Sequence, residues 1–199
     1  MSSPTALIVP GLRDAVATHW QTLLEAKLRA AGRPVACVPP MGREDLDNAR
    51  KVAAIEQVAQ SVDGPIVLVA HSGGCIMVAH WAQQTQRAVQ GALLATPPDF
   101  EAPLPDGYPT RDTLRAGGWL PVPRTRLPFP SIVAASQDDP LAGFDRVAML
   151  ARDWGSRLVD LGKVGHLNPA SGYGEWRRAE GFIDELAVMP TSARRAEAR

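Results

Sequence analysis

Apolar residues along this chain form short continuous runs that alternate with stretches of helical periodicity. Six runs are rich in β-branched and small apolar residues and are bounded mostly by Gly or Pro, which is typical of strands buried on both faces: residues 6–10, 34–38, 66–70, 88–95, 131–135 and 157–161. Between them, apolar positions recur at three- and four-residue steps: 20–28, 52–59, 75–82, 144–150 and 182–186. This alternation predicts an α/β fold with right-handed crossovers and a doubly wound parallel sheet of about six strands.

One stretch interrupts the alternation. Residues 96–130 contain nine of the eighteen prolines and only a short helical pattern near 111–116. A long irregular segment in a compact domain is usually a functional loop, and a loop that follows a parallel strand reaches the edge of the sheet where ligands bind. We therefore expect an ordered cap rather than a disordered insert. Trp119 and Leu120 are the candidates for lining a pocket there, unless they only anchor the segment to the core.

Composition narrows the class of protein. A chain of 199 residues fits one domain, and we expect it to span 1–189, with 190–199 as a polar, disordered tail. Lys plus Arg and Asp plus Glu both number 21, which argues against a nucleic-acid or membrane-surface partner. The sequence shows neither a membrane-length apolar run nor a signal-peptide pattern, and two cysteines are too few for a disulfide scaffold. These features predict a cytoplasmic protein.

The end of the third predicted strand carries a candidate nucleophile. The apolar run 66–70 stops at Ser72, and an apolar helical pattern follows at once, which is the strand–turn–helix context of a nucleophile elbow. Such a turn is tight and needs small neighbours, which Ala70, Gly73 and Gly74 supply. The simpler alternative is that Ser72 only caps the following helix by accepting a backbone N–H.

A candidate base and acid follow the nucleophile in the order that hydrolases of this plan use, Ser, then Asp or Glu, then His. Asp138 and Asp139 form the turn after the run 131–135, and His166 follows the last predicted strand. Catalytic groups of open parallel sheets gather at these carboxyl ends. An imidazole can take the serine proton when a carboxylate orients it. The residues alone do not choose between the two aspartates, one of which would cap the turn.

Three other histidines compete with His166 for the role of base. His71 adjoins the candidate nucleophile, so its side chain is expected to point elsewhere. His80 falls within the helical pattern after Ser72, and His19 lies in the first predicted helix. None of the three follows a predicted strand as His166 does.

An oxyanion formed at Ser72 would need two N–H donors. One is expected from the residue after the nucleophile, Gly73, and the other from the loop after the first strand. In that loop, Gly11 permits a close approach, and Leu12 supplies the candidate N–H. The alternative is that Pro10-Gly11 is simply a turn. The loop lacks the G-x-G-x-x-G fingerprint of a nucleotide binder.

Taken together, these motifs resemble the small α/β-hydrolase family of bacterial YdeN and the retinoblastoma-binding serine hydrolase. The resemblance covers about residues 7–186 and rests on these pieces: Ile8-Val9-Pro10-Gly11, His19-Trp20, Ala70-His71-Ser72-Gly73-Gly74, Asp138-Asp139-Pro140, Gly165-His166 and Ser171-Gly172-Tyr173-Gly174-Glu175-Trp176. It implies a Ser72–Asp139–His166 triad, with the aspartate before proline as the acid, no metal and no organic cofactor. It also implies the strand order second, first, third, fourth, fifth, sixth. Ala70 departs from the family's usual elbow glycine.

The expected function is hydrolysis of a carboxylic ester or thioester through an acyl-enzyme on Ser72, with a small-molecule substrate and an acyl or leaving-group pocket near Trp119 and Leu120. Two rivals stay open. The chain could be a non-catalytic binding protein on a hydrolase fold, because fold alone does not prove function. It could also be an acyltransferase that uses the same triad with an acceptor other than water.

Overall fold

The computed structural model describes residues 3–12 and 16–190, so most of the predicted tail lies outside the described residues. Six strands form one parallel sheet in the order β2-β1-β3-β4-β5-β6. In chain order they are β1 (Thr5–Val9), β2 (Val35–Cys37), β3 (Ile66–His71), β4 (Val89–Ala95), β5 (Ser131–Ala135) and β6 (Arg157–Asp160). The predicted fold class is confirmed, and the strand order is the one that the family resemblance implies.

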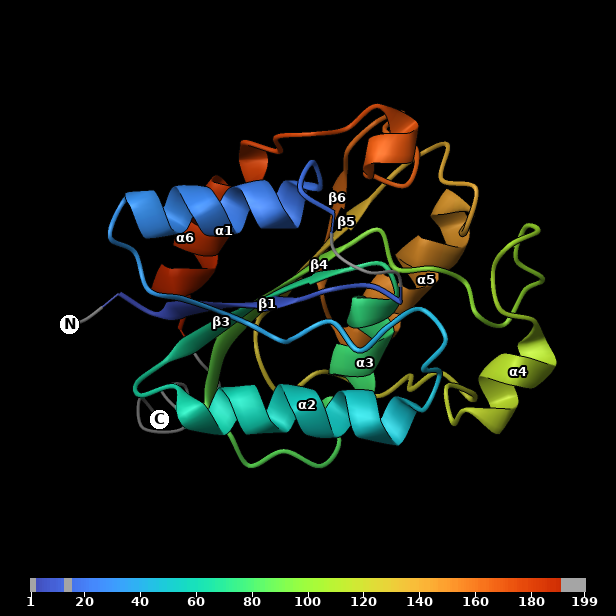
Figure 1. Ribbon diagram of the computed structural model, residues 1–199, viewed down its shortest axis with the longest axis horizontal. Coiled ribbons are helices and arrows are strands. Elements are labelled where there is room, and N and C mark those ends of the chain that lie inside the picture. The colour runs from blue at the N-terminus through green and yellow to red at the C-terminus, as the bar shows by residue number, and fades with distance from the viewer. Residues whose placement is uncertain (1–2, 13–15, 191–199) are drawn as a thin grey trace.

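Helices cover both faces of the sheet (Figure 1). One face carries α1 (Trp20–Ala30) and α6 (Arg178–Val188). The other carries α2 (Asn48–Ser61), α3 (Gly73–Trp81) and α5 (Phe144–Trp154). No helix within the described residues has the length and apolar composition needed to cross a bilayer.

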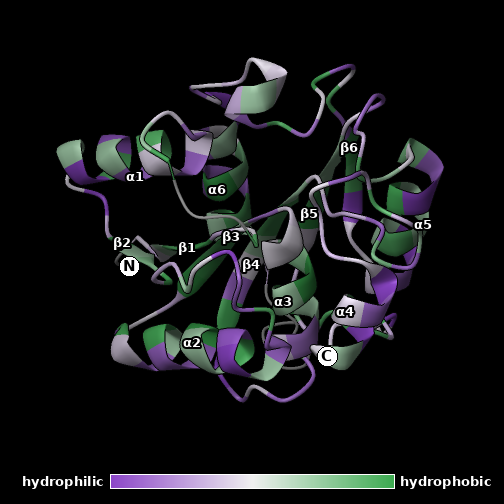
Figure 2. Ribbon diagram, turned by 45° about the vertical axis from the view of Figure 1, so that its right-hand side comes forward, coloured by the Kyte–Doolittle hydropathy of each residue, from purple (hydrophilic) through white to green (hydrophobic). Residues whose placement is uncertain are grey.

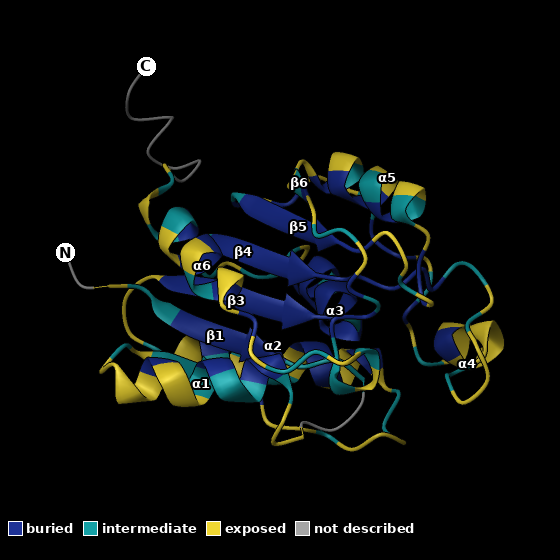
Figure 3. Ribbon diagram, turned by 90° about the horizontal axis from the view of Figure 1, so that it is seen from above, coloured by how far each residue is buried: buried dark blue, intermediate teal, exposed yellow. Residues whose placement is uncertain are grey.

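The central strands supply side chains to two hydrophobic cores. In β1, Leu7 and Val9 face the core under α2 and α3, whereas Ala6 and Ile8 face the core under α1 and α6. All the β3 residues from Ile66 to Ala70 are fully buried, and the strands appear as the buried layer of Figure 3. Figure 2 shows the same strands as mostly hydrophobic, with helices of mixed hydropathy outside them. Burial on both faces explains why the strand runs are continuous rather than alternating.

The proline-rich segment 96–130 is ordered and contains the short helix α4 (Arg111–Ala116). Its buried side chains join the core on the α2, α3 and α5 face: Phe100, Leu114, Trp119, Val122, Leu127 and Phe129. Hydrogen bonds tie it to the end of α5, because the Trp154 indole donates to the Pro123 carbonyl at 2.8 Å and the Leu127 N–H donates to the Trp154 carbonyl at 3.0 Å. The segment is therefore part of the packed structure.

The first turn of α3 is pressed against the end of β1. A Cβ on Gly74 would lie 2.6 Å from the Pro10 carbonyl oxygen and 2.7 Å from that of Val9, closer than any real Cβ approaches. Only glycine permits this contact, which sets the distance between the elbow and the loop after β1.

We predict that Gly74→Ala lowers the free energy of unfolding by about 1–3 kcal/mol, the usual cost of forcing an extra carbon into a packed site. Gly181→Ala is the matched control, since Gly181 also lies in a helix but has open space around its Cα. The control should gain up to about 1 kcal/mol from helix propensity. Denaturant unfolding measures both, and an equal change in the two variants would contradict the packing argument.

Candidate active site

Ser72 occupies a strained turn between β3 and α3. Its backbone has φ 55° and ψ −131°, a positive φ that non-glycine residues rarely adopt. Its side chain makes no capping hydrogen bond to α3, so the helix-cap alternative is excluded. Instead, its Oγ lies 2.8 Å from Nε2 of His166. Gly11 packs against it, because a Cβ there would lie 3.1 Å from the Ser72 Cβ.

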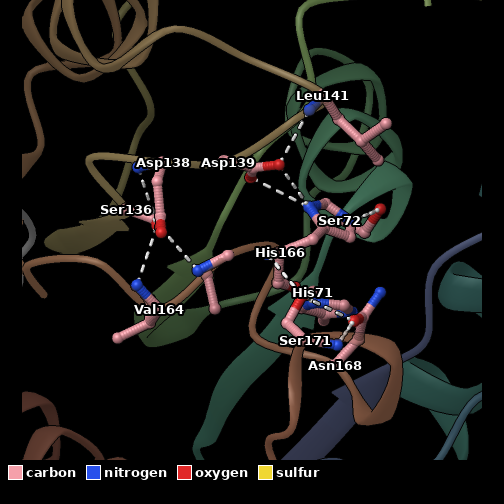
Figure 4. A network of polar contacts seen from close by, with 12 residues as sticks. His71, Ser72, Ser136, Asp138, Asp139, Leu141, Val164, His166, Asn168 and Ser171 are labelled. Atoms are coloured by element: carbon pink, nitrogen blue, oxygen red, sulfur yellow. Dashed lines mark hydrogen bonds and ion pairs between the residues drawn. The ribbon is translucent and has the colours of Figure 1, made fainter. Parts of the chain in front are cut away.

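His166 and Asp139 come from the loops after β6 and β5 and meet beside Ser72 (Figure 4). Nδ1 of His166 lies 3.0 and 2.9 Å from the two carboxylate oxygens of Asp139. The Asp139 side chain is 2 % exposed and that of His166 is 5 % exposed. One Asp139 oxygen also accepts the Leu141 N–H at 2.9 Å, which fixes the carboxylate. A carboxylate on Nδ1 leaves Nε2 free to accept a proton from the serine hydroxyl.

Asp138 has a different environment from Asp139. Its carboxylate accepts the Gly165 backbone N–H at 2.7 Å and the Ser136 hydroxyl at 2.9 Å. Both hydrogen bonds lower the pKa of this exposed carboxyl group, and the bond from Gly165 has the larger effect. Asp138 therefore holds the backbone of the loop that carries His166, while Asp139 contacts the His166 ring. The two aspartates, which the sequence pattern does not distinguish, thus have different contacts in the structure.

The two candidate oxyanion donors lie next to each other. A Cβ on Gly73 would lie 3.5 Å from the Leu12 nitrogen and 2.8 Å from its Cγ, so the loop after β1 touches the first residue of α3. Neither N–H has a hydrogen-bond acceptor among the described residues.

Two further histidines lie at the site, and their contacts were missed from the sequence. The His71 ring is buried and its Nε2 lies 2.9 Å from the His166 carbonyl oxygen. Burial lowers the pKa of His71 well below its ordinary value, and the neighbouring His166 and His19 lower it further. His19 caps α1 by accepting the Gln21 N–H at its Nδ1, 3.2 Å away. No sequence pattern indicates the His71 contact, because it joins residues 95 positions apart, whereas the His19 contact is a local cap two residues along the chain.

A cavity of about 600 Å³ opens at Ser72 and His166. Most of its apolar lining comes from four regions: the loop after β1 with Pro10 and Leu12, the end of β2 with Val38, Pro39 and Pro40, the segment 96–130 with Pro98, Phe100 and Tyr108, and the loop with Leu141. The start of α1, with Gln21, Thr22 and Glu25, and residues 168–170 also line it. The cap segment therefore contributes to the pocket, though through other residues than expected.

Trp119 and Leu120 do not line this cavity, so that expectation was wrong. Trp119 is fully buried, its indole N–H donates to the Leu46 carbonyl at 2.8 Å, and its ring packs edge-on against Phe100. A buried indole needs a hydrogen-bond acceptor, and Leu46 supplies it on the side of α2. Trp119 thus anchors the cap, which is the alternative reading, and Phe100 rather than Trp119 reaches the pocket.

The described residues contain neither a candidate metal site nor a reactive cysteine. No cluster of three His, Cys, Asp or Glu suited to a metal ion occurs among residues 3–12 and 16–190. Both thiols are held protonated, since burial raises the pKa of Cys75 well above its ordinary value and that of Cys37 to about 12. Neither cysteine therefore competes with Ser72 as a nucleophile.

A family model described as serine hydrolase matches residues 6–185. The chain belongs to the serine hydrolase family. This membership and two similar solved structures together confirm the resemblance to the YdeN group. A structure described as a YdeN-like hydrolase from Pectobacterium atrosepticum is 31% identical, with a TM-score of 0.72, and the match covers 92% of each chain. The ydeN gene product from B. subtilis is 19% identical, with a TM-score of 0.70, over 92% of this chain and 98% of that chain.

A more distant structural neighbour shows the fold alone. Est1E from Butyrivibrio proteoclasticus, solved with ferulic acid bound, is 14% identical, with a TM-score of 0.64, over 94% of this chain and 87% of that chain. No curated protein matches the chain significantly.

The histidines make stability depend on pH. Burial, and to a lesser extent His166, lowers the pKa of His19 from 6.5 to about 4. Between pH 6.5 and about pH 4, His19 is protonated in the unfolded chain but not in the folded chain. Acidification across this window should therefore lower the free energy of unfolding. We predict that in His19→Asn the free energy of unfolding falls less on acidification, by up to about 3 kcal/mol, because Asn keeps the helix cap without titrating.

Urea unfolding of both proteins above and below this window measures the effect. The pKa of His71 is also lowered in the folded chain. The variant should therefore still lose part of its free energy of unfolding in acid. Identical losses in the two proteins would show that His19 is protonated equally in the folded and unfolded chains.

Proposed function

We propose that this serine hydrolase cleaves a carboxylic ester or thioester through an acyl-enzyme, with Ser72 as nucleophile, His166 as base and Asp139 as the acid that orients it. The observation that carries the proposal is the continuous hydrogen-bonded line from the Ser72 hydroxyl through the His166 ring to the Asp139 carboxylate. This line joins the ends of three strands at the mouth of a cavity.

The mechanism follows from the positions of these groups. His166 Nε2 takes the proton of Ser72 as Oγ attacks the carbonyl carbon, and Asp139 stabilises the imidazolium that forms. The tetrahedral intermediate then collapses, and His166 returns the proton to the leaving alcohol or thiol. Water, activated by His166 in the same way, attacks the acyl-enzyme and releases the acid and Ser72.

The oxyanion is held by the backbone N–H groups of Leu12 and Gly73. Two features support this role: their adjacency beside Ser72 and their lack of acceptors in the described chain. Gly73 also begins α3, so the positive end of the helix dipole faces the developing charge. Each such donor contributes about 3 kcal/mol of transition-state stabilisation.

The cavity supports a substrate with apolar groups. Proline, aromatic and aliphatic side chains line it on both the β2 side and the cap side of Ser72, as at Val38 and Phe100. A carbonyl seated at Ser72 could thus place its acyl part on one side and its leaving group on the other. A small apolar ester, such as a p-nitrophenyl ester, fits the volume of about 600 Å³.

A fluorophosphonate probe and p-nitrophenyl acetate test the triad. We predict that the wild-type chain is labelled and hydrolyses the ester, and that Ser72→Ala abolishes both while the fold survives. Asp139→Asn should lower turnover by about 10⁴-fold, because the His166 tautomer is lost. Asp138→Asn is the matched control and should retain most of the turnover, since the Asn side-chain oxygen can still accept the Gly165 N–H and residue 138 does not contact the His166 ring.

Labelling that persists in Ser72→Ala would rule out this nucleophile. Equal losses in the two Asn variants would contradict the assignment of the acid. A wild-type chain that folds but neither labels nor turns over would favour the binding-protein alternative. Ester exchange with added alcohols, in preference to hydrolysis, would favour an acyltransferase.

A further inference from the structure

The side chain of His71 links the nucleophile's strand to the loop of the candidate base. His71 is the last residue of β3 and directly precedes Ser72. Its Nε2 lies 2.9 Å from the backbone carbonyl oxygen of His166, a contact across 95 positions of the sequence. A carbonyl oxygen only accepts, so Nε2 of His71 carries a proton and donates it. Figure 4 shows the His71 ring below the triad, away from the Ser72 hydroxyl.

The surroundings of His71 keep this donor uncharged. The ring is 4 % exposed and is enclosed by other rings: His19 at 4.7 Å, His166 at 5.0 Å and Trp20 at 5.8 Å between centroids. Burial, followed by the two neighbouring imidazoles, lowers the pKa of His71 well below its ordinary value. A neutral His71 places no second positive charge beside His166 when that ring takes the serine proton.

The loop that His71 holds needs external support. His166 is flanked by Gly165 with φ 55° and Leu167 with φ 48°, and a leucine rarely adopts a positive φ. The His166 N–H donates to the Ser171 hydroxyl at 3.0 Å, and the Gly165 N–H donates to Asp138 at 2.7 Å. These two bonds come from the loop itself and from the loop after β5. The bond from His71 comes from the strand that carries Ser72.

We propose that His71 is a positioning residue for the base: by donating to the His166 carbonyl, it fixes the distance between the His166 ring and the Ser72 hydroxyl. This inference rests on the proposed function of Ser72 and His166. Without the donor, a buried carbonyl loses its partner and the loop is free to shift away from Ser72. Proton transfer requires a short Oγ–Nε2 distance, and a displacement of about 1 Å can cost about 100-fold in rate.

Replacement of His71 by Leu, Asn and Gln tests the proposal. Leu fills the space without a donor, and the Asn amide is too short to reach the carbonyl. The Gln amide nitrogen extends to about the position of Nε2 and can restore the bond. The measurements are kcat and KM for p-nitrophenyl acetate, and the rate of fluorophosphonate labelling across the pH range in which an imidazole titrates.

We expect His71→Leu and His71→Asn to lower kcat and the labelling rate by about 10- to 100-fold, with KM nearly unchanged. We expect His71→Gln to recover most of the loss. The pH profile of labelling should change in the Leu and Asn variants, because the environment of His166 changes. A merely structural role would lower the melting temperature of the variants without this rescue or this change of profile.

His80 supplies a matched control. His80 lies in α3, close to Ser72 in sequence, and its Nε2 also contacts a backbone carbonyl, at 3.2 Å. That carbonyl belongs to Trp119 and not to the His166 loop. His80→Leu and His80→Gln should leave the labelling rate unchanged.

Wild-type labelling and kcat in His71→Leu and His71→Asn would overturn the proposal, as would equal losses in all three His71 variants. Because the wild-type chain and Ser72→Ala are assayed beside them, a failure of the proposed function appears separately, as a wild-type chain without labelling or turnover.

Discussion

The close contact between the start of α3 and the end of β1 is the constraint on which the site depends. At Gly74 the helix lies so near the carbonyls of Val9 and Pro10 that no side chain fits. This contact brings the loop after β1 against Ser72 and sets the Leu12 N–H beside that of Gly73. Beside this contact, Ser72 has a positive φ and its hydroxyl makes no helix cap but lies 2.8 Å from His166 Nε2. Backbone packing thus positions the candidate nucleophile and its candidate oxyanion donors.

The candidate base, His166, is held by a separate set of contacts that converge on one loop. Asp139 orients the His166 ring, Asp138 holds the Gly165 N–H, and His71 reaches the His166 carbonyl from β3. These contacts come from two parts of the sheet, the turn after β5 and the end of β3, so the parallel sheet supplies the frame on which the distances are set. This arrangement explains why two adjacent aspartates have different tasks, one on a ring and one on a backbone.

Much of this architecture follows from local sequence patterns. The buried strands could be predicted because both faces are covered and the runs are continuous, and Ser72 because a tight strand–turn–helix junction needs its glycines. The choice of Asp139 needed the family resemblance, since both aspartates satisfy the same local pattern. Trp119 was placed wrongly because its burial depends on the Leu46 carbonyl, 73 positions away. The contact of His71 was missed for the same reason: long-range packing leaves no periodic signal in the sequence.

A crystal structure of the fluorophosphonate adduct would test the account most directly, because the bound phosphoryl group imitates the tetrahedral intermediate. The account predicts phosphorus bonded to Ser72 Oγ, with the phosphoryl oxygen within hydrogen-bond distance of the Leu12 and Gly73 N–H groups and His166 Nε2 beside the ester oxygen. Phosphorus on another residue, or a phosphoryl oxygen directed away from both N–H groups, would contradict it.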